Sequence, residues 1–135
     1  MPASLRFGLG LLISGLVTAV LALGVVYWQR ETRLQAMAQN STNGDVDVGK
    51  AAMTRYGCGA CHEIPGLAGA NGRVGPSLDG FARRAEIAGL LVNQPDALVR
   101  WLREPQAVSQ SSGMPNQGIG EDEARDIAAY LYMLD

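Results

Sequence analysis

Two cysteines and a histidine stand close together near the middle of the chain. Cys58 and Cys61 are three positions apart, and His62 follows at once. This spacing matches the attachment signature of c-type haem, in which both thiols bond the porphyrin edge and the imidazole binds iron. One tight turn brings the two sulfurs to the two vinyl groups of a single macrocycle. The motif therefore predicts one covalent haem c on Cys58 and Cys61, with His62 as an iron ligand.

The amino-acid inventory weighs against the other sites that such a motif could build. A structural zinc site takes four protein ligands, whereas the chain contains two cysteines and one histidine. A thioredoxin-like redox pair would lie beside a strand in a βαβ pattern, and the flanking sequence has helical patterns instead. Because the chain has a single histidine, His62 is the imidazole available to iron.

Met114 is the predicted second iron ligand. A thioether is a neutral, polarisable ligand, and His/Met ligation raises the reduction potential of haem iron. Among the five methionines, Met1 and Met37 lie in or near an apolar N-terminal segment, and Met53 and Met133 lie on predicted helices. Met114 alone lies in a predicted loop far from His62 in the sequence, and a proline follows it. The alternative role for Met114 is to fill a gap in the core.

The N-terminal part of the chain is apolar enough to enter a membrane. Residues 7–29 contain no charged side chain, and a helix of that length spans about 34 Å, against about 30 Å for a bilayer core. A cleavable signal has a shorter apolar run and a cut site close behind it, whereas the best small-residue site, Ala36-Met37-Ala38, lies well past the run. Residues 1–30 are therefore predicted to be an uncleaved signal-anchor that forms a single transmembrane helix.

A polar stretch at residues 31–44 is predicted to link the anchor to a domain at residues 45–135. Its first part, Glu31 to Gln39, consists of helix formers that could extend the anchor helix by two turns. The run Asn40-Ser41-Thr42-Asn43-Gly44 favours turns and predicts a break in the chain there. The domain carries twelve acidic and eight basic side chains, a net charge of −4 before any haem propionates are counted. The domain therefore lacks the excess of basic side chains that is typical of nucleic-acid binding. Its charge favours partners that tolerate an acidic surface.

Capping residues and hydrophobic spacing predict an all-α domain with long loops. Asp45 is an N-cap candidate, Pro95 suits a first helical position, and three acids from Glu121 suit a helix N-terminus. No alternating strand pattern stands out. The expected helices run from about Val46 to Tyr56, from about Pro95 to Pro105 and from Glu121 to about Leu134, with a short one within Phe81–Leu91 and with loops at 63–79 and 106–120.

These residues resemble the class I c-type cytochromes over about residues 45–135. The resemblance implies a cytochrome c-like helical domain packed around one covalent haem. It also implies that the first and last helices cross with Gly49 and Tyr130 at the contact, that the Pro76 carbonyl accepts the other ring N–H of His62, and that Trp101 packs near a propionate. The matching positions, in order, are Gly49, Met53, Tyr56, Cys58 to His62, Gly75-Pro76-Ser77-Leu78, Trp101, Met114-Pro115 and Ala129-Tyr130-Leu131.

Iron with protein ligands at both axial positions has no vacancy for a substrate, so the predicted function is one-electron transfer and not enzymatic catalysis. The expected partners are the membrane and redox proteins such as a quinol-oxidising complex or a haem-copper oxidase, with no small-molecule substrate. The protein would pass electrons to or within a respiratory or photosynthetic complex, as a carrier or as a fixed subunit of a terminal oxidase. The predicted anchor crosses the membrane once, and the resemblance implies that the membrane is a bacterial cytoplasmic membrane with the C-terminal domain on its periplasmic side.

An open-coordination haem protein is the alternative. If Met114 does not bind, the vacant iron position could bind a diatomic gas or peroxide, and the domain would be a gas sensor or a peroxide-reactive enzyme. Such chemistry usually relies on an acid–base group beside the iron. The loop around Met114 offers no second histidine for that role.

Overall fold

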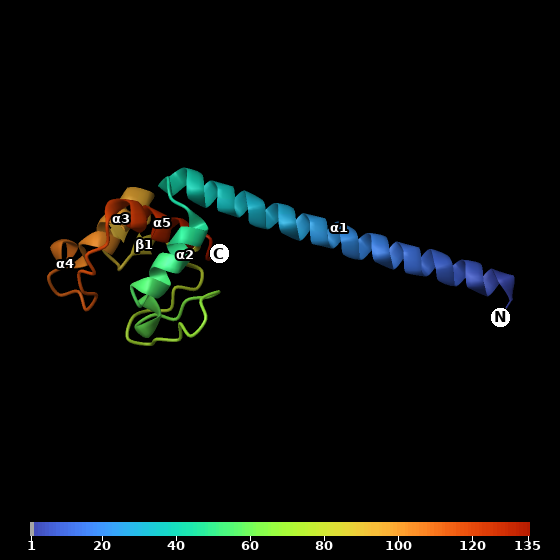
Figure 1. Ribbon diagram of the computed structural model, residues 1–135, viewed down its shortest axis with the longest axis horizontal. Coiled ribbons are helices and arrows are strands. Elements are labelled where there is room, and N and C mark those ends of the chain that lie inside the picture. The colour runs from blue at the N-terminus through green and yellow to red at the C-terminus, as the bar shows by residue number, and fades with distance from the viewer. Residues whose placement is uncertain (1) are drawn as a thin grey trace. The chain divides into compact units, whose positions relative to one another are not determined.

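The computed structural model describes residues 2–135, which form two compact units with their boundary between Leu34 and Gln35 (Figure 1). The chain is mostly helical, which confirms the predicted all-α class. In the second unit, the elements that follow the long first helix form a domain of helices and extended loops.

The first helix, α1 (Ala3–Thr42), is long and apolar enough to cross a membrane. Its stretch Arg6–Thr42 holds an 18-residue window of mean hydropathy 2.5 in which no residue is buried. The helix extends past residue 30 through the helix formers of residues 31–39, as expected, and continues to Thr42, inside the stretch where the break was predicted. The helix formers between Glu31 and Gln39 explain the extension. The chain turns only at Asn43, which has φ of 54°, and Gly44.

The last turns of α1 belong to the second compact unit. Ala38 and Thr42 are buried there, and the Thr42 hydroxyl donates to the Ala38 carbonyl at 2.8 Å while it accepts from the Gly44 amide at 3.1 Å. The Arg125 guanidinium donates to the Thr42 carbonyl at 3.3 Å. Gly44 passes so close to the Arg125 backbone that a Cβ would not fit.

Three predicted helices are confirmed. The helix α2 (Val46–Arg55) begins at Asp45, whose carboxylate accepts hydrogen bonds from the backbone amides of the first turn as an N-cap. The helix α3 (Pro95–Arg103) begins with its proline at the first helical position. The helix α5 (Glu121–Tyr132) begins with the three acidic residues that favour a helix N-terminus.

The prediction of a short helix within Phe81–Leu91 is wrong for most of that stretch. The chain forms one 3₁₀ turn, η2 (Phe81–Arg83), and then an antiparallel hairpin of β1 (Glu86–Ile87) and β2 (Leu91–Val92). Ala88 and Gly89 both have positive φ, at 53° and 68°, and two left-handed residues in a row cannot continue a helix. A further short helix, α4 (Pro105–Val108), lies at the start of the predicted loop 106–120.

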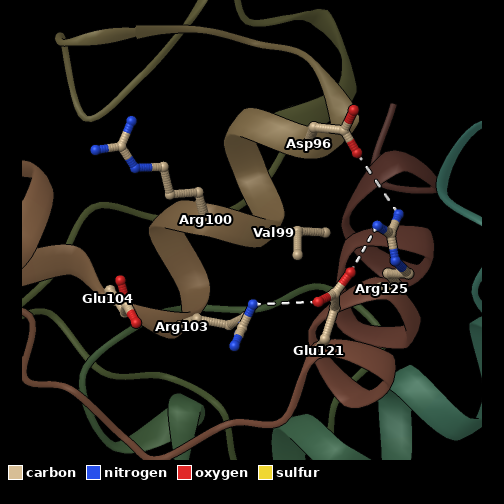
Figure 2. A pocket seen from close by; sticks show the side chains of 7 residues that line it. All are labelled: Asp96, Val99, Arg100, Arg103, Glu104, Glu121 and Arg125. Atoms are coloured by element: carbon tan, nitrogen blue, oxygen red, sulfur yellow. Dashed lines mark hydrogen bonds and ion pairs between the residues drawn. The ribbon is translucent and has the colours of Figure 1, made fainter.

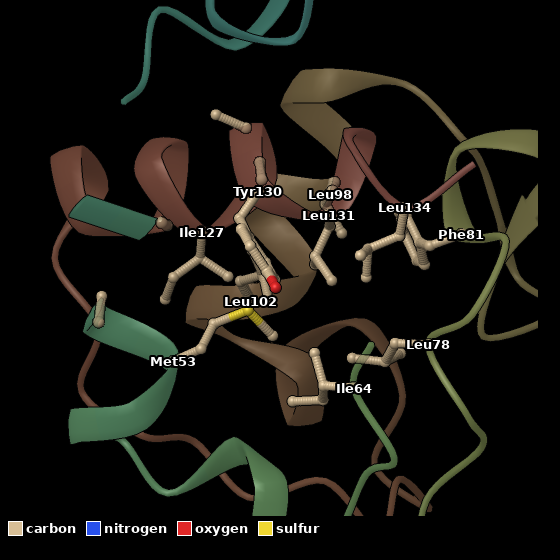
Figure 3. Close-up of a cluster of buried hydrophobic side chains, with 14 of the residues drawn as sticks. Met53, Ile64, Leu78, Phe81, Leu98, Leu102, Ile127, Tyr130, Leu131 and Leu134 are labelled. Carbon is tan, nitrogen blue, oxygen red and sulfur yellow. The ribbon is translucent and has the colours of Figure 1, made fainter. Parts of the chain in front are cut away.

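The core of the domain forms where α5 packs against α2 and α3 (Figure 3). A Cβ on Gly49 would collide with the Asp126 carbonyl, so the glycine lets the backbones of α2 and α5 meet. The Tyr130 ring lies 6.0 Å from Nζ of Lys50 on α2. Both residues implied by the resemblance thus lie at this helix contact. The buried side chains include Met53, Ile64, Leu98, Leu102, Ile127 and Leu131.

Candidate functional site

The two cysteines and the histidine lie on one turn that follows α2. Gly57, with φ of 67°, turns the chain sharply into the 3₁₀ turn η1 (Cys58–Ala60). The amides of Cys61 and His62 both donate to the Cys58 carbonyl, at 3.2 and 3.0 Å. Both thiols are free, and burial raises the pKa of the Cys58 thiol. The turn therefore presents two unpaired sulfurs with an imidazole immediately after them.

The His62 ring is held by a backbone carbonyl on the segment that follows. Nδ1 lies 2.7 Å from the Pro76 oxygen, which confirms the contact implied by the resemblance. A carbonyl can only accept, so Nδ1 is the donor in this hydrogen bond and Nε2 is the ring nitrogen left for a metal. A carbonyl partner on one nitrogen commonly fixes the tautomer of a metal-binding histidine and raises its basicity. The hydrogen bond through Nδ1 therefore orients the His62 ring so that Nε2 can bind a metal.

Because Gly75 has no side chain, the His62 ring can occupy the space where a Cβ of residue 75 would lie. A Cβ there would lie 2.6 Å from Nδ1 and 2.9 Å from Nε2 of the ring, too close for any real side chain. The Gly75 amide also donates to the Cys61 carbonyl at 2.8 Å. The segment that carries Pro76 is thus fixed directly to the cysteine turn.

The loop after His62 folds back onto the same turn. The Gly72 amide donates to the Gly59 carbonyl at 3.1 Å, and the Ile64 amide donates to the Ala70 carbonyl at 3.0 Å. A Cβ on Gly59 would lie 2.6 Å from that of Ala70. Small residues in this loop therefore let two backbones pack closely behind the motif.

Met114 lies in the loop between α4 and α5, as predicted, and its half-buried side chain packs against the core. Its amide donates to the Ser112 hydroxyl at 3.1 Å, which orders the turn before Pro115. Met53, in contrast, is 1% exposed among the core side chains of Figure 3. Trp101 is half-buried against the same core. The pairing of His62 with Met114 on one iron stays a prediction.

A contact that the sequence did not reveal joins the end of α2 to α5. The Tyr56 hydroxyl donates to Oε2 of Glu123 at 2.5 Å, and the Arg55 guanidinium donates to Oε1 of the same carboxylate at 2.5 Å. The Tyr56 hydrogen bond lowers the pKa of Glu123 and raises the pKa of Tyr56. Since Tyr56 and Gly57 lead into the cysteine turn, Glu123 holds the start of that turn against α5.

A shallow pocket of about 220 Å³ between α3 and α5 contains a network of ion pairs (Figure 2). Arg125 pairs with Glu121 at 2.9 Å and with Asp96 at 3.6 Å, and Arg103 pairs with Glu121 at 3.3 Å. Hydrogen bonding from Arg125 lowers the pKa of Glu121. Basic and acidic side chains balance in this lining, and no residue of the cysteine motif takes part. The ion pairs in this lining therefore join α3 to α5.

The residues present fit a covalent haem better than a metal ion held by side chains alone. Among residues 2–135, no three His, Cys, Asp or Glu side chains gather to hold a metal ion. The cysteine turn instead offers two free thiols, one imidazole with a free Nε2, and a glycine cradle beside the ring. This donor set matches the chemistry of c-type haem attachment.

Comparisons with known proteins agree with this geometry. The sequence pattern of the cytochrome c family matches residues 46–135. Cytochrome c oxidase subunit 2 of Alkalihalophilus pseudofirmus is 29% identical over 102 residues, which cover 75% of this chain and 29% of that protein. The chain thus spans less than a third of the length of this relative. No solved structure shows significant similarity to the chain.

Proposed function

The chain belongs to the cytochrome c family, and from that premise we propose that it is a membrane-tethered one-electron carrier with His62 and Met114 as axial ligands. The family carries a covalent c-type haem, and Cys58 and Cys61 are the thiols that would hold it. When bound, haem supplies an iron centre that exchanges one electron at a time. The observation that carries the proposal is the 2.7 Å contact between His62 and Pro76, which leaves Nε2 free for iron.

Each protein group then has a defined task. His62, whose ring the Pro76 carbonyl orients, would bind the iron through Nε2, and the Met114 thioether would be the second protein ligand. With both positions filled by protein, the iron offers no place for a substrate. The domain would have to keep most of the porphyrin away from water, because low polarity and ligand identity together set the reduction potential.

The N-terminal helix supports membrane attachment. We propose that residues 1–30 remain as the anchor, that residues 31–44 continue from it into the compact unit that begins at Gln35, and that residues 45–135 lie on the periplasmic side. An anchored carrier searches a thin layer beside the bilayer, which raises its effective concentration for partners in the same membrane.

The relative named as an oxidase subunit supports a respiratory partner. We propose that the protein passes electrons from a quinol-oxidising complex to a haem-copper oxidase, or within a terminal oxidase as a fixed subunit. The domain has a net charge of −4, so the matching surface on its partner should be neutral or basic. Co-purification with an oxidase after detergent extraction would distinguish a fixed subunit from a free carrier.

The visible spectrum of the oxidised protein tests the proposal. Sulfur ligation gives ferric haem a weak long-wavelength band, which we expect in the wild type. Met114→Ala should abolish this band and lower the reduction potential, because the thioether favours reduced iron. Met37→Ala, which alters an exposed methionine of α1, is the control and should change neither.

Two results would contradict the proposal. A colourless wild-type protein from a host competent for cytochrome maturation would exclude haem attachment. Rapid carbon monoxide binding by the reduced wild type would show an open iron position, and would favour the gas-sensing or peroxide-reactive alternative.

A further inference from the structure

A compact loop follows the Pro76 carbonyl that holds His62. Nη2 of Arg84 donates to the Ser77 carbonyl and, at 2.9 Å, to the Asp79 carbonyl. The same guanidinium lies 5.5 Å from the centre of the Phe81 ring. The Arg84 side chain thus ties together residues 77–84. This segment is called the Pro76 loop because it directly follows Pro76.

The side chain of Asn93 holds this loop from outside. Its Nδ2 donates to the Phe81 carbonyl at 3.1 Å and to the Arg84 carbonyl at 2.9 Å. Its Oδ1 accepts from the Tyr132 hydroxyl at 2.9 Å. Both amide protons and the amide oxygen therefore have partners, so the side chain is fixed in one orientation.

Tyr132 connects this network to the last helix. Burial raises the pKa of Tyr132 to about 12, so the hydroxyl keeps its proton at neutral pH and donates to Asn93. The rings of Tyr132 and Phe81 pack edge to face, with centroids 6.1 Å apart. The Ala82 amide donates to the Leu134 carbonyl at 2.9 Å, and Figure 3 shows Phe81 beside Leu134. The loop is therefore fastened to the C-terminal end of α5.

The position of the Pro76 oxygen depends on the backbone on both sides of it. Before Pro76, the Gly75 amide is bound to the Cys61 carbonyl at 2.8 Å, and after it the Leu78 amide is bound to the Glu63 carbonyl at 2.8 Å. The remainder of the support on the later side comes from the Pro76 loop. A carbonyl that cannot swing away keeps its hydrogen bond to Nδ1 of His62 short, and that bond makes the imidazole a more basic ligand.

We propose that Asn93 and Tyr132 are positioning residues for the axial imidazole, because they hold the loop that keeps the Pro76 carbonyl on His62. This inference rests on the proposed function, since it requires His62 to bind iron. A firm hydrogen bond to Nδ1 favours the oxidised iron, so the network lowers the reduction potential.

Tyr132→Phe tests the inference with a minimal change. It removes the donor to Asn93 and keeps the ring that packs on Phe81. In the reduced protein, exchange of the His62 Nδ1 proton with solvent, measured by NMR, should become about fivefold faster, as expected for the loss of one partly buried hydrogen bond. The reduction potential should rise.

Tyr130→Phe is the matched control. It removes a phenol hydroxyl from the same helix, and that hydroxyl donates at 2.7 Å to the Pro65 carbonyl, outside the Pro76 loop. Neither the exchange rate nor the potential should change in this variant. Equal changes in the two tyrosine variants would overturn the inference, because they would indicate a general loosening of the domain.

Asn93→Asp gives a second measurement. It replaces the amide that donates to two carbonyls by a carboxylate that can only accept, so the Pro76 loop should lose more support than in Tyr132→Phe. If Asn93→Asp does not fold, Tyr132→Phe decides alone. A wild type that carries haem, with Tyr132→Phe variants unchanged in proton exchange and potential, would overturn the inference and leave the proposed function standing. A colourless wild type would overturn both.

Discussion

At the scale of single residues, Glu123 is the carboxylate that joins two distant parts of the site. It lies at the start of α5 and accepts hydrogen bonds from Tyr56 and Arg55 at the end of α2. The partly exposed position limits what such an ion pair contributes to stability. The contact instead fixes the position of Tyr56, which immediately precedes the turn that presents the cysteines.

Glu123→Gln should make the folding stability of the protein depend less on acid pH. The pKa of Glu123 is lowered in the folded state, chiefly by the Tyr56 hydrogen bond, from an ordinary value of 4.5. Its contribution is therefore present above pH 4.5 and is lost as the pH falls through the lower folded pKa. The melting temperature of the variant should be below that of the wild type at pH 7, and the two should converge in acid.

Asp122→Asn is the control for this titration, because Asp122 is an exposed acid in the same helical turn and the substitution makes the same change in charge. Melting curves of all three proteins between pH 7 and pH 3 would make the comparison. If Asp122→Asn followed the same pH profile as Glu123→Gln, the effect would come from net charge and not from the contact with Tyr56.

At the scale of elements, the crossing of α2 and α5 fixes the framework on which the cysteine turn is built. The two helices approach most closely at Gly49, where the Asp126 carbonyl occupies the space of a side chain. The small residues Ala52, Ala124 and Ala128 are fully buried in the same domain core. Close packing of this kind tolerates little added volume, since neighbouring backbone cannot move aside.

Gly49→Ala should destabilise the protein by about 3 kcal/mol, at the upper end of the usual cost of overpacking, because the new methyl group meets backbone and not a flexible side chain. Ala51→Val adds atoms to the exposed side of the same helix and should cost less than about 1 kcal/mol, mainly through helix propensity. Urea unfolding of both variants measures the difference. Similar losses in the two would mean that the helices can separate to accept the methyl group.

At the scale of the whole molecule, the compact haem-binding unit begins before the domain that the sequence predicted. Ala38 and Thr42 are buried in the unit that starts at Gln35, whereas the polar composition of residues 31–44 suggested a linker. A segment that contributes buried side chains and hydrogen bonds to a domain is part of its fold.

Three fragments expressed behind a cleavable export signal would test this boundary. Fragments that begin at Gln29 and at Gln35 should have the same melting temperature, because residues 29–34 lie outside the second unit. A fragment that begins at Gly44 should be less stable by roughly 2 kcal/mol, since it loses the buried Ala38 and Thr42 and their hydrogen bonds. Equal melting temperatures for all three would support the linker that the sequence predicted.

Local signals in the sequence determined the cysteine turn and three helices of this protein. The motif from Cys58 to His62 depends only on spacing along one turn. The starts of α2, α3 and α5 follow from Asp45, Pro95 and the acids after Gly120, because capping acts on amides a few residues away. The contact between His62 and Pro76 was available only through the resemblance to a known family.

Tertiary structure decided the features that depend on distant groups. The hairpin after η2 requires left-handed backbone at Ala88, which a side-chain pattern does not predict. The bond from Tyr56 to Glu123 and the bond from Tyr132 to Asn93 join residues 67 and 39 positions apart. Residue types and their spacing were enough to identify the side chains that can bond a porphyrin. Packing alone decided which side chains hold them in place, because a hydrogen bond depends on where the whole fold brings its two atoms.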